Sequence, residues 1–185
     1  LKMAGESGLP RFCTLTSAEM SDPLAPDCIA NTEFLAINRD EATALCGMQY
    51  DPNDPQPFLA AMAHAVEELN PALKLLVTVG QLGSWGWQDG RWEFIPAARV
   101  GVKSTAGAGD ASMAGLIVAT AIGLPFIRSE PVLRKGLAEL PIETATDFAA
   151  VLGSVSIVSA DTINMDADAG YLLDHGYPLG LTFCP

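Results

Sequence analysis

The chain has little positive charge. Of its 185 residues, 10 are Lys or Arg and 22 are Asp or Glu, which gives a formal net charge of -12. No cluster of basic residues offsets this charge, so the sequence argues against nucleic-acid binding, which depends on basic surfaces. Only 17% of the residues are charged and 49% are hydrophobic, a balance typical of a folded chain rather than a disordered one.

Cysteine and histidine are few, and neither has the spacing of metal ligands. The cysteines are Cys13, Cys28, Cys46 and Cys184, and the histidines are His64 and His175. Since no Cys-x-x-Cys pair is present, a zinc site is disfavoured. Four reduced thiols in a cytoplasmic protein are expected rather than a disulfide framework.

Long apolar runs are also missing. The longest, residues 114–126, is interrupted by Gly and Pro and is too short to span a bilayer, so no membrane partner is expected. The N-terminus lacks the charged stretch, apolar core and cleavage site of a signal peptide. The first residue is Leu1 rather than Met, which suggests that the chain is a piece of something longer.

What is present is an alternation of strand and helix signals. Strands are expected near residues 12–15, over 28–37 with an end at Asn38, and over 73–79. Helices are expected over residues 39–46, 58–69, 110–122, 132–140 and 146–159. This order of elements predicts a layered α/β structure.

An Asp-Gly pair at residues 89–90 has aromatic residues on both sides. Asp-Gly tolerates the positive φ angles of a type I′ turn, so the pair predicts a β-hairpin. Packing across the strands accounts for these aromatics better than a ligand cage does. They are Trp85, Trp87, Trp92 and Phe94.

Small residues at positions 104–109 lead directly into the helix expected over 110–122. They let the backbone come close to a ligand, and the first N–H groups of the helix have no internal partner. With the helix dipole, these donors favour an anion such as a transferring phosphoryl group. Asp110 stands at the same point, where it could accept a proton from an attacking hydroxyl.

Three other interpretations of this turn stay open. Asp110 could be an N-cap residue, and the glycines could form an ordinary loop. Gly107 and Gly109 could also be half of a dinucleotide fingerprint with Glu130 as its acid. The sequence context disfavours the fingerprint, because position 112 is Ser and no βαβ continuation follows. A P-loop pattern is absent.

Three motifs together resemble the ribokinase-like (PfkB) carbohydrate kinase family. The segment STAGAGD at residues 104–110, followed by Ala114-Gly115, resembles the family's second signature. The segment NRDEA at 38–42 is similar to its Asn-x-x-Glu motif, and TVGQLG at 78–83 to its nucleotide-side Thr-x-Gly-x-x-Gly segment. The motifs follow the family's order, and the resemblance extends over residues 11–160.

The resemblance implies a three-layer α/β/α ribokinase-like fold and an ATP-dependent phosphotransferase. The acceptor would be a hydroxyl of a sugar or nucleoside. By resemblance, Asp110 would be the catalytic base. Gly107, Ala108 and Gly109 would present backbone N–H groups to the transferring phosphoryl group as an anion hole.

The other two motifs would serve the nucleotide and its metal. By resemblance, Glu41 would help to hold Mg²⁺ through water, Asn38 would lie near the phosphates, and Thr78, Gly80 and Gly83 would lie under the nucleotide. Asn38 and Glu41 also have the spacing of a capping box, and both roles can coexist. Thr78–Gly83 could equally be an ordinary strand-to-hairpin turn. A monovalent cation near residues 161–165 is compatible with the family, but no residue there specifies it.

Departures from the family limit what can be predicted. Ser104 replaces the usual Asp at the head of the signature, and the acceptor is not specified. Nothing in residues 1–27 resembles the family's sugar-binding Gly-Gly signature or its β-strand lid. We therefore expect residues 1–185 to form one domain, the C-terminal nucleotide-binding and catalytic portion of a larger kinase. Members often dimerise through that lid, so a homodimer is compatible with the family. The alternative is a non-catalytic nucleotide-binding fragment or degenerate homologue that acts with a partner chain.

Overall fold

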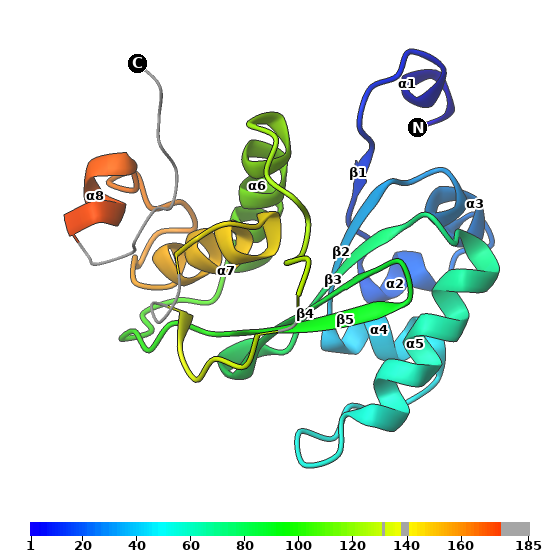
Figure 1. Cartoon of the computed structure of the whole chain (residues 1–185), viewed down its shortest axis with the longest axis horizontal. Coiled ribbons are helices and arrows are strands. Elements are labelled where there is room, and N and C mark those ends of the chain that lie inside the picture. The colour runs from blue at the N-terminus through cyan, green and yellow to red at the C-terminus, as the bar shows by residue number, and fades with distance from the viewer. Residues whose placement is uncertain (131, 138–140, 175–185) are drawn as a thin grey trace. The chain divides into compact units, whose positions relative to one another are not determined.

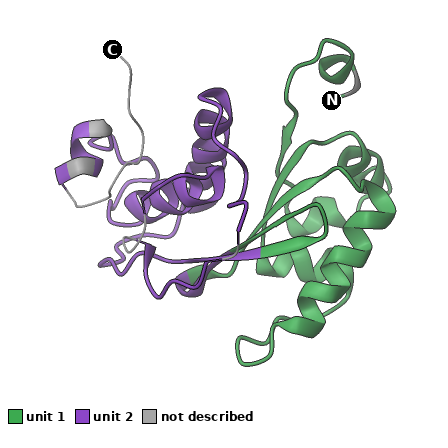
Figure 2. Ribbon diagram, viewed as in Figure 1, with its two compact units in different colours: residues 1–80, 85–92 green, residues 81–84, 93–185 purple. Residues whose placement is uncertain are grey.

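The computed structural model describes residues 1–130, 132–137 and 141–174 (Figure 1). They fall into two compact units (Figure 2). The first comprises residues 1–80 and 85–92, and the second comprises residues 81–84 and the described residues from 93 onward. His175 and Cys184 lie outside the described residues.

Within the described residues, five strands form one sheet in the order β1-β2-β3-β4-β5. The first three, β1 (Phe12–Cys13), β2 (Phe34–Asn38) and β3 (Lys74–Thr78), are parallel, and Asn38 is the register partner of Thr78. The carboxyl ends of β2 and β3 therefore lie side by side. The hairpin strands are β4 (Gly83–Gln88) and β5 (Arg91–Pro96), with the 3₁₀ turn η1 (Gly80–Leu82) before them.

Five helices belong to the first unit. They are α1 (Lys2–Glu6), α2 (Ser17–Met20), α3 (Ala25–Ala30), α4 (Arg39–Cys46) and α5 (Gln56–Leu69). Helix α4 contacts β2, β3 and α5, and α5 also contacts α3 (Figure 1). Their apolar faces fill the core with Ile29, Phe58, Met62 and Val66, against the almost wholly buried strands β2 and β3.

The second unit is built on two helices that cross closely, α6 (Ala108–Ala121) and α7 (Ala145–Ser156). A Cβ added to Gly115 of α6 would lie 2.7 Å from the Cα of Ala149 in α7. A Cβ on Gly153 of α7 would lie 2.5 Å from the Oγ of Ser112 in α6. The two glycines thus let the helix backbones approach each other. A short helix, α8 (Ala169–Asp174), follows.

The clearest sequence signals are confirmed. Asp89 and Gly90 have φ angles of 51° and 76°, so both take the positive φ of a type I′ turn between β4 and β5. Trp92 packs against Trp85 edge to face, with ring centroids 6.5 Å apart, which is the cross-strand packing expected of the aromatics. Gly47 ends α4 in the left-handed conformation.

Two element predictions are wrong in part. Of the strand expected over residues 28–37, residues 28–30 belong to helix α3 and 31–33 belong to neither a helix nor a strand. Pro26 stands in the first turn of α3, where proline is favoured. The helix expected over residues 132–140 is not α-helical at 132–137, and 138–140 lie outside the described residues. There Arg134 is buried in ion pairs while the adjacent Leu133 is fully exposed, a pattern opposite to that of an apolar helix face.

The helices in the described part of the chain were also compared with the length and hydropathy that a membrane span requires. None of them meets both requirements.

Candidate functional site

A hollow of about 230 Å³ lies at the carboxyl ends of β2 and β3 in the first unit. It is lined by Asn38, Arg39, Asp40, Thr78, Val79 and Gly80. Two sequence motifs that are 40 residues apart thus meet here, because parallel pairing places Asn38 beside Thr78. Open α/β sheets bind ligands at this edge.

The start of α4 is capped by its own side chains. The Oδ1 of Asn38 accepts hydrogen bonds from the N–H groups of Asp40 and Glu41, at 2.9 and 3.0 Å. The Oε2 of Glu41 accepts one from the N–H of Asn38 at 2.7 Å. The capping box predicted for these residues is therefore present, and it satisfies N–H groups at this helix start.

Two residues that line the hollow belong to the NRDEA segment, but no role was predicted for them from the sequence. Arg39 and Asp40 follow Asn38 directly, are exposed, and pair with each other at 3.3 Å between Nε and Oδ1. A helix that begins at the last residue of a strand turns its first residues towards the sheet edge. The place of Arg39 and Asp40, directly after a predicted strand and at the start of a predicted helix, is the feature of the sequence from which their position at the hollow could have been predicted.

The glycines of the nucleotide-side segment differ in what they do. Gly80 lines the hollow at a φ of +64°, with open space where a Cβ would stand. Gly83 belongs to the second unit, and a Cβ there would overlap the carbonyl oxygen of Ile95 in β5. Gly83 therefore has a structural reason to be glycine, and its nucleotide contact stays a prediction.

The start of α6 lacks a side-chain cap. The N-cap is Gly107, with a φ of +81°. The N–H of Ala108 donates to the carbonyl of Thr105 at 3.3 Å. Within the described residues, no group accepts from the N–H groups of Gly107, Gly109 or Asp110. These donors, at the positive end of a 14-residue helix, are suited to an anion.

Asp110 is the third residue of α6, so the interpretation of Asp110 as an N-cap is wrong. The helix begins two residues earlier than expected, because Gly107 takes the left-handed conformation that ends the preceding turn. The Asp110 side chain is exposed, and no partner for it occurs within the described residues. Its carboxylate is therefore accessible to solvent and to a ligand.

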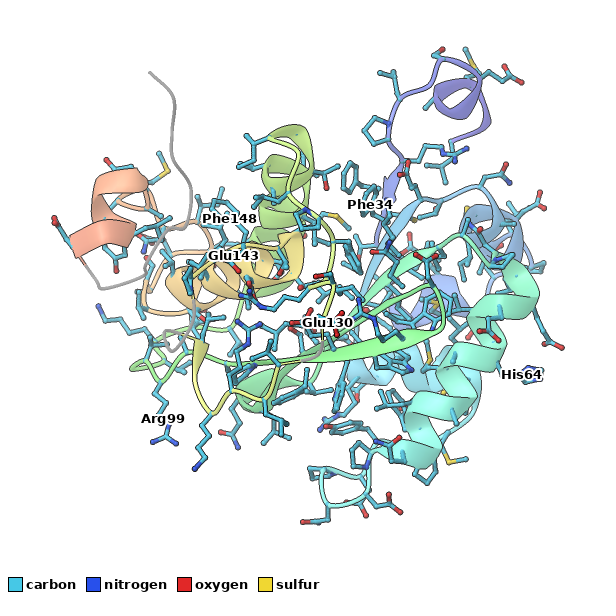
Figure 3. All side chains as sticks on the ribbon, viewed as in Figure 1. Phe34, His64, Arg99, Glu130, Glu143 and Phe148 are labelled. Carbon is cyan, nitrogen blue, oxygen red and sulfur yellow. The ribbon has the colours of Figure 1, made fainter. Side chains whose placement is uncertain are left out.

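The described titratable residues contain no group of three that could hold a metal ion by themselves. His64 projects from α5 away from the rest of its unit and lies 3.6 Å from Glu68, one helical turn further on (Figure 3). Cys13, Cys28 and Cys46 are free thiols, and burial raises the pKa of Cys13 and Cys46. Reactive thiolates are therefore disfavoured at those two positions.

Comparison with known proteins decides the family. The model of the pfkB family of carbohydrate kinases matches residues 4–169. The chain belongs to this family. Comparison with curated protein sequences gave no match.

Solved structures agree with the family in fold. A probable sugar kinase from Rhizobium etli CFN 42 aligns with a TM-score of 0.70 at 18% identity, over 95% of this chain and 47% of that one. An adenosine kinase from Sinorhizobium meliloti gives a TM-score of 0.67 at 17% identity, over 94% and 47%. Aminoimidazole riboside kinase from Salmonella enterica, complexed with aminoimidazole riboside and an ATP analogue, gives 0.67 at 19%, over 94% and 54%. The α/β prediction and its ribokinase-like form are confirmed, and the chain spans about half the length of these structures.

The carboxylates of Asp40 and Glu41 at the start of α4 fit the magnesium ion that the family resemblance implies. Glu41 uses Oε2 in the capping box, and no hydrogen bond engages its Oε1 within the described residues. Asp40 adds an exposed carboxylate. Mg²⁺ prefers a few carboxylates, water and substrate phosphates, so a water-mediated site beside Glu41 suits this donor set.

A second cluster of charges in this pfkB-family chain is buried within the second unit. Asp147 of α7 accepts a hydrogen bond from Arg128 at 2.6 Å and another from Arg134. Arg128 also pairs with Glu143 at 2.5 Å, and its backbone N–H donates to Glu93 at 2.9 Å. Glu143 lies just before α7 (Figure 3). Burial is the main cause that raises the pKa of Glu93.

Proposed function

We propose that the chain carries the ATP-binding and phosphoryl-transfer part of a kinase that acts on a hydroxyl of a sugar or nucleoside. The observation that carries this proposal is the uncapped start of α6. Its free N–H groups and the exposed Asp110 stand together in a chain of the pfkB family. The ATP analogue and riboside of the Salmonella structure support the choice of ligands.

Asp110 is assigned as the general base. It accepts the proton of the acceptor hydroxyl as that oxygen attacks the γ-phosphate of ATP. The N–H groups of Gly107 and Gly109 then stabilise the charge on the transferring phosphoryl group. Ala108 contributes less than the sequence suggested, because its N–H already donates to Thr105.

The hollow at the strand ends is assigned to the nucleotide and its metal. Within the first unit, Asn38, Thr78 and Gly80 are assigned to contact the nucleotide. The nucleotide contact of Gly83 stays the prediction made from the sequence. Glu41 holds Mg²⁺ through water, and the ion supplies positive charge to the phosphates that this acidic chain lacks in its side chains. A monovalent cation near residues 161–165 belongs to the same proposal, and a potassium titration of ATP binding tests it.

Asp110→Asn tests the assignment. A general base accounts for about 10²- to 10⁴-fold in rate, so transfer to any acceptor should fall by that factor or more. MgATP binding, measured by calorimetry, should survive because Asn is isosteric. Asp54→Asn is the matched control, since Asp54 is exposed in a loop of the first unit and should leave both quantities unchanged. Equal turnover in wild type and Asp110→Asn would overturn the role of Asp110.

The alternative is a nucleotide-binding chain that transfers phosphate only with a partner. It is favoured by one observation, that the chain spans about half the length of its solved relatives. We expect this chain alone to bind MgATP weakly and to phosphorylate sugars and nucleosides slowly. Robust transfer by the 185-residue chain would contradict the alternative and the expectation that most of the acceptor pocket is missing. A cytoplasmic location and a homodimer stay predictions.

A further inference from the structure

The back of the turn at Gly107 rests on a segment far along the chain. A Cβ added to Gly107 would overlap the carbonyl oxygen of Thr162 and lie 2.8 Å from its Cγ2. Both residues belong to the second unit. Because the two backbones are in direct contact, the position of the Thr162 peptide sets how far the Gly107 turn can move.

The side chain of Asn164 links the segment that contains Thr162 to helix α7. The Nδ2 of Asn164 donates to the carbonyl of Val155 at 3.0 Å. Val155 lies in the last turn of α7, where carbonyls lack partners within the helix. The Oδ1 of Asn164 accepts from the N–H of Asp166 at 3.2 Å. The partly buried amide thus ties the returning chain to the end of α7.

The chain that leads into the turn is tied to the same place. The carbonyl of Ile157, the residue after α7, accepts hydrogen bonds from Lys103 and Ser104, at 2.8 and 3.3 Å. The turn is therefore held on two sides. Ile157 fixes the residues before it, and the segment behind Gly107 depends on Asn164.

We infer that Asn164 is a positioning residue for the phosphoryl-binding turn. It touches neither the acceptor nor the phosphates in this proposal. It acts through the Thr162 peptide, which keeps Gly107 and the first N–H groups of α6 in place. The inference rests on the proposed function for its catalytic consequence, because displacement of a catalytic group by about 1 Å can cost on the order of 10²-fold in rate. The structural link itself needs no activity.

The test removes the side-chain donor in two ways. Asn164→Asp keeps size and the Oδ acceptor but loses the N–H donor, and Asn164→Ala loses both without adding charge. The matched control is Asn31→Asp with Asn31→Ala. The Nδ2 of Asn31 donates to the carbonyl of Asp27 in α3, at 2.7 Å, in the first unit. The same kind of bond is lost there, away from the turn's own unit.

The first readout uses the protein without nucleotide. We expect the amide resonances of Gly107, Gly109 and Asp110 to shift in both Asn164 variants. Amide exchange at Ala111, whose N–H donates to Gly107 at 2.8 Å, should accelerate by about 5- to 10-fold, as loss of one hydrogen bond predicts. The Asn31 variants should change neither. Unchanged resonances and exchange at the turn in both Asn164 variants would overturn the inference.

A reciprocal variant keeps the inference testable if the Asn164 variants do not fold. Gly107→Ala places a methyl group against Thr162, so it should shift the amide resonances of Ile163 and Asn164. No response there would show that the two segments are not linked.

The second readout separates this inference from the proposed function. If the chain transfers phosphate, Asn164→Ala should lower kcat by about 10- to 10²-fold and leave the KM for the acceptor unchanged. A wild-type chain that neither binds MgATP nor transfers phosphate would refute the proposed function. The response of the turn to the Asn164 variants would still be measured.

Discussion

Helices α4 and α6 each begin at a family motif, and the free N–H groups at the two helix starts are treated in opposite ways. At α4, Asn38 and Glu41 satisfy the free N–H groups with their own oxygens. At α6, the N-cap is Gly107, which has no side chain to offer, and three N–H groups stay free within the described residues. The same local element can thus be closed by its own sequence or left open for an external anion.

The two helix starts therefore suit different kinds of ligand, as the proposed function requires. The α4 start presents the remaining carboxylate oxygens of Asp40 and Glu41, which suit a hydrated cation. The α6 start presents N–H groups, which suit the phosphoryl group itself. An acidic chain can therefore hold a polyphosphate without a basic surface.

The two units also differ in what they bury. All four charged residues in the buried part of the described chain lie in the second unit. They are Glu93, Arg128, Arg134 and Asp147. The core of the first unit is apolar, and Thr32 is the buried polar residue of that unit within the described part of the chain. The unit with the open helix start is thus the one whose stability depends on ion pairs.

The largest effect is expected from Asp147→Asn. Removal of this charge takes from Arg128 and Arg134 the carboxylate that hydrogen-bonds to both, and leaves them the more distant Glu93, at 3.6 and 4.0 Å. Breaking a buried pair costs about 3–5 kcal/mol of unfolding free energy. The control is Glu33→Gln, since its pair with Lys74, at 3.2 Å, is partly exposed and contributes about 0–1 kcal/mol. Urea unfolding measures both. Similar small losses would contradict the contrast between the units.

Next comes a pair of glycine variants. Gly107 and Gly47 have φ angles of +81° and +71°, which cost an L-residue about 1–2 kcal/mol. A Cβ at Gly47 meets open space, whereas one at Gly107 overlaps Thr162. Gly107→Ala should therefore destabilise more than Gly47→Ala in thermal unfolding, and it alone should weaken MgATP binding. Equal losses would mean that the Thr162 contact adds no constraint.

Variants of the α4 start separate capping from metal binding. Asn38→Ala should cost about 1 kcal/mol, because it removes the acceptor for the N–H groups of Asp40 and Glu41. Glu41→Gln should leave stability nearly unchanged, since Gln also completes a capping box. It should nevertheless reduce the dependence of ATP binding on Mg²⁺, measured by calorimetry with and without the ion. If the Mg²⁺ dependence is retained, Glu41 acts only as a cap.

The smallest effect is a pH dependence. The pKa of Glu93 is raised in the folded chain, mainly by burial, so the folded state binds the proton more tightly than the unfolded state. Stability from this group is complete below the ordinary pKa of glutamate and is lost as pH rises through the folded value. Glu93→Gln should flatten this decline in urea unfolding measured across pH values. A decline as steep in Glu93→Gln as in wild type would assign it to other groups.

Local signals in the sequence predicted much of this structure. Asp89-Gly90 and the capping box at Asn38 specify backbone conformations directly, and both are found. The small-residue turn before α6 was also predicted, although Asp110 was placed at the helix start rather than in its third position.

Tertiary contacts explain what the sequence could not predict. Proline is common in loops as well as in the first turn of a helix, so Pro26 alone does not reveal that α3 begins beside it. At residues 132–137, ion pairs of Arg134 override an apolar pattern that suggested a helix. The contact of Gly107 with Thr162 joins residues more than 50 positions apart, and no local pattern in the sequence predicts it.

One measurement tests the central contrast most directly. Inorganic pyrophosphate is titrated without divalent cations into the ¹⁵N-labelled chain, and amide resonances are followed at both helix starts. The free N–H groups of Gly109 and Asp110 should shift saturably, whereas those of Asp40 and Glu41, already bonded to Asn38, should not. Absence of a shift at Gly109 and Asp110, or equal shifts at both helix starts, would contradict the account.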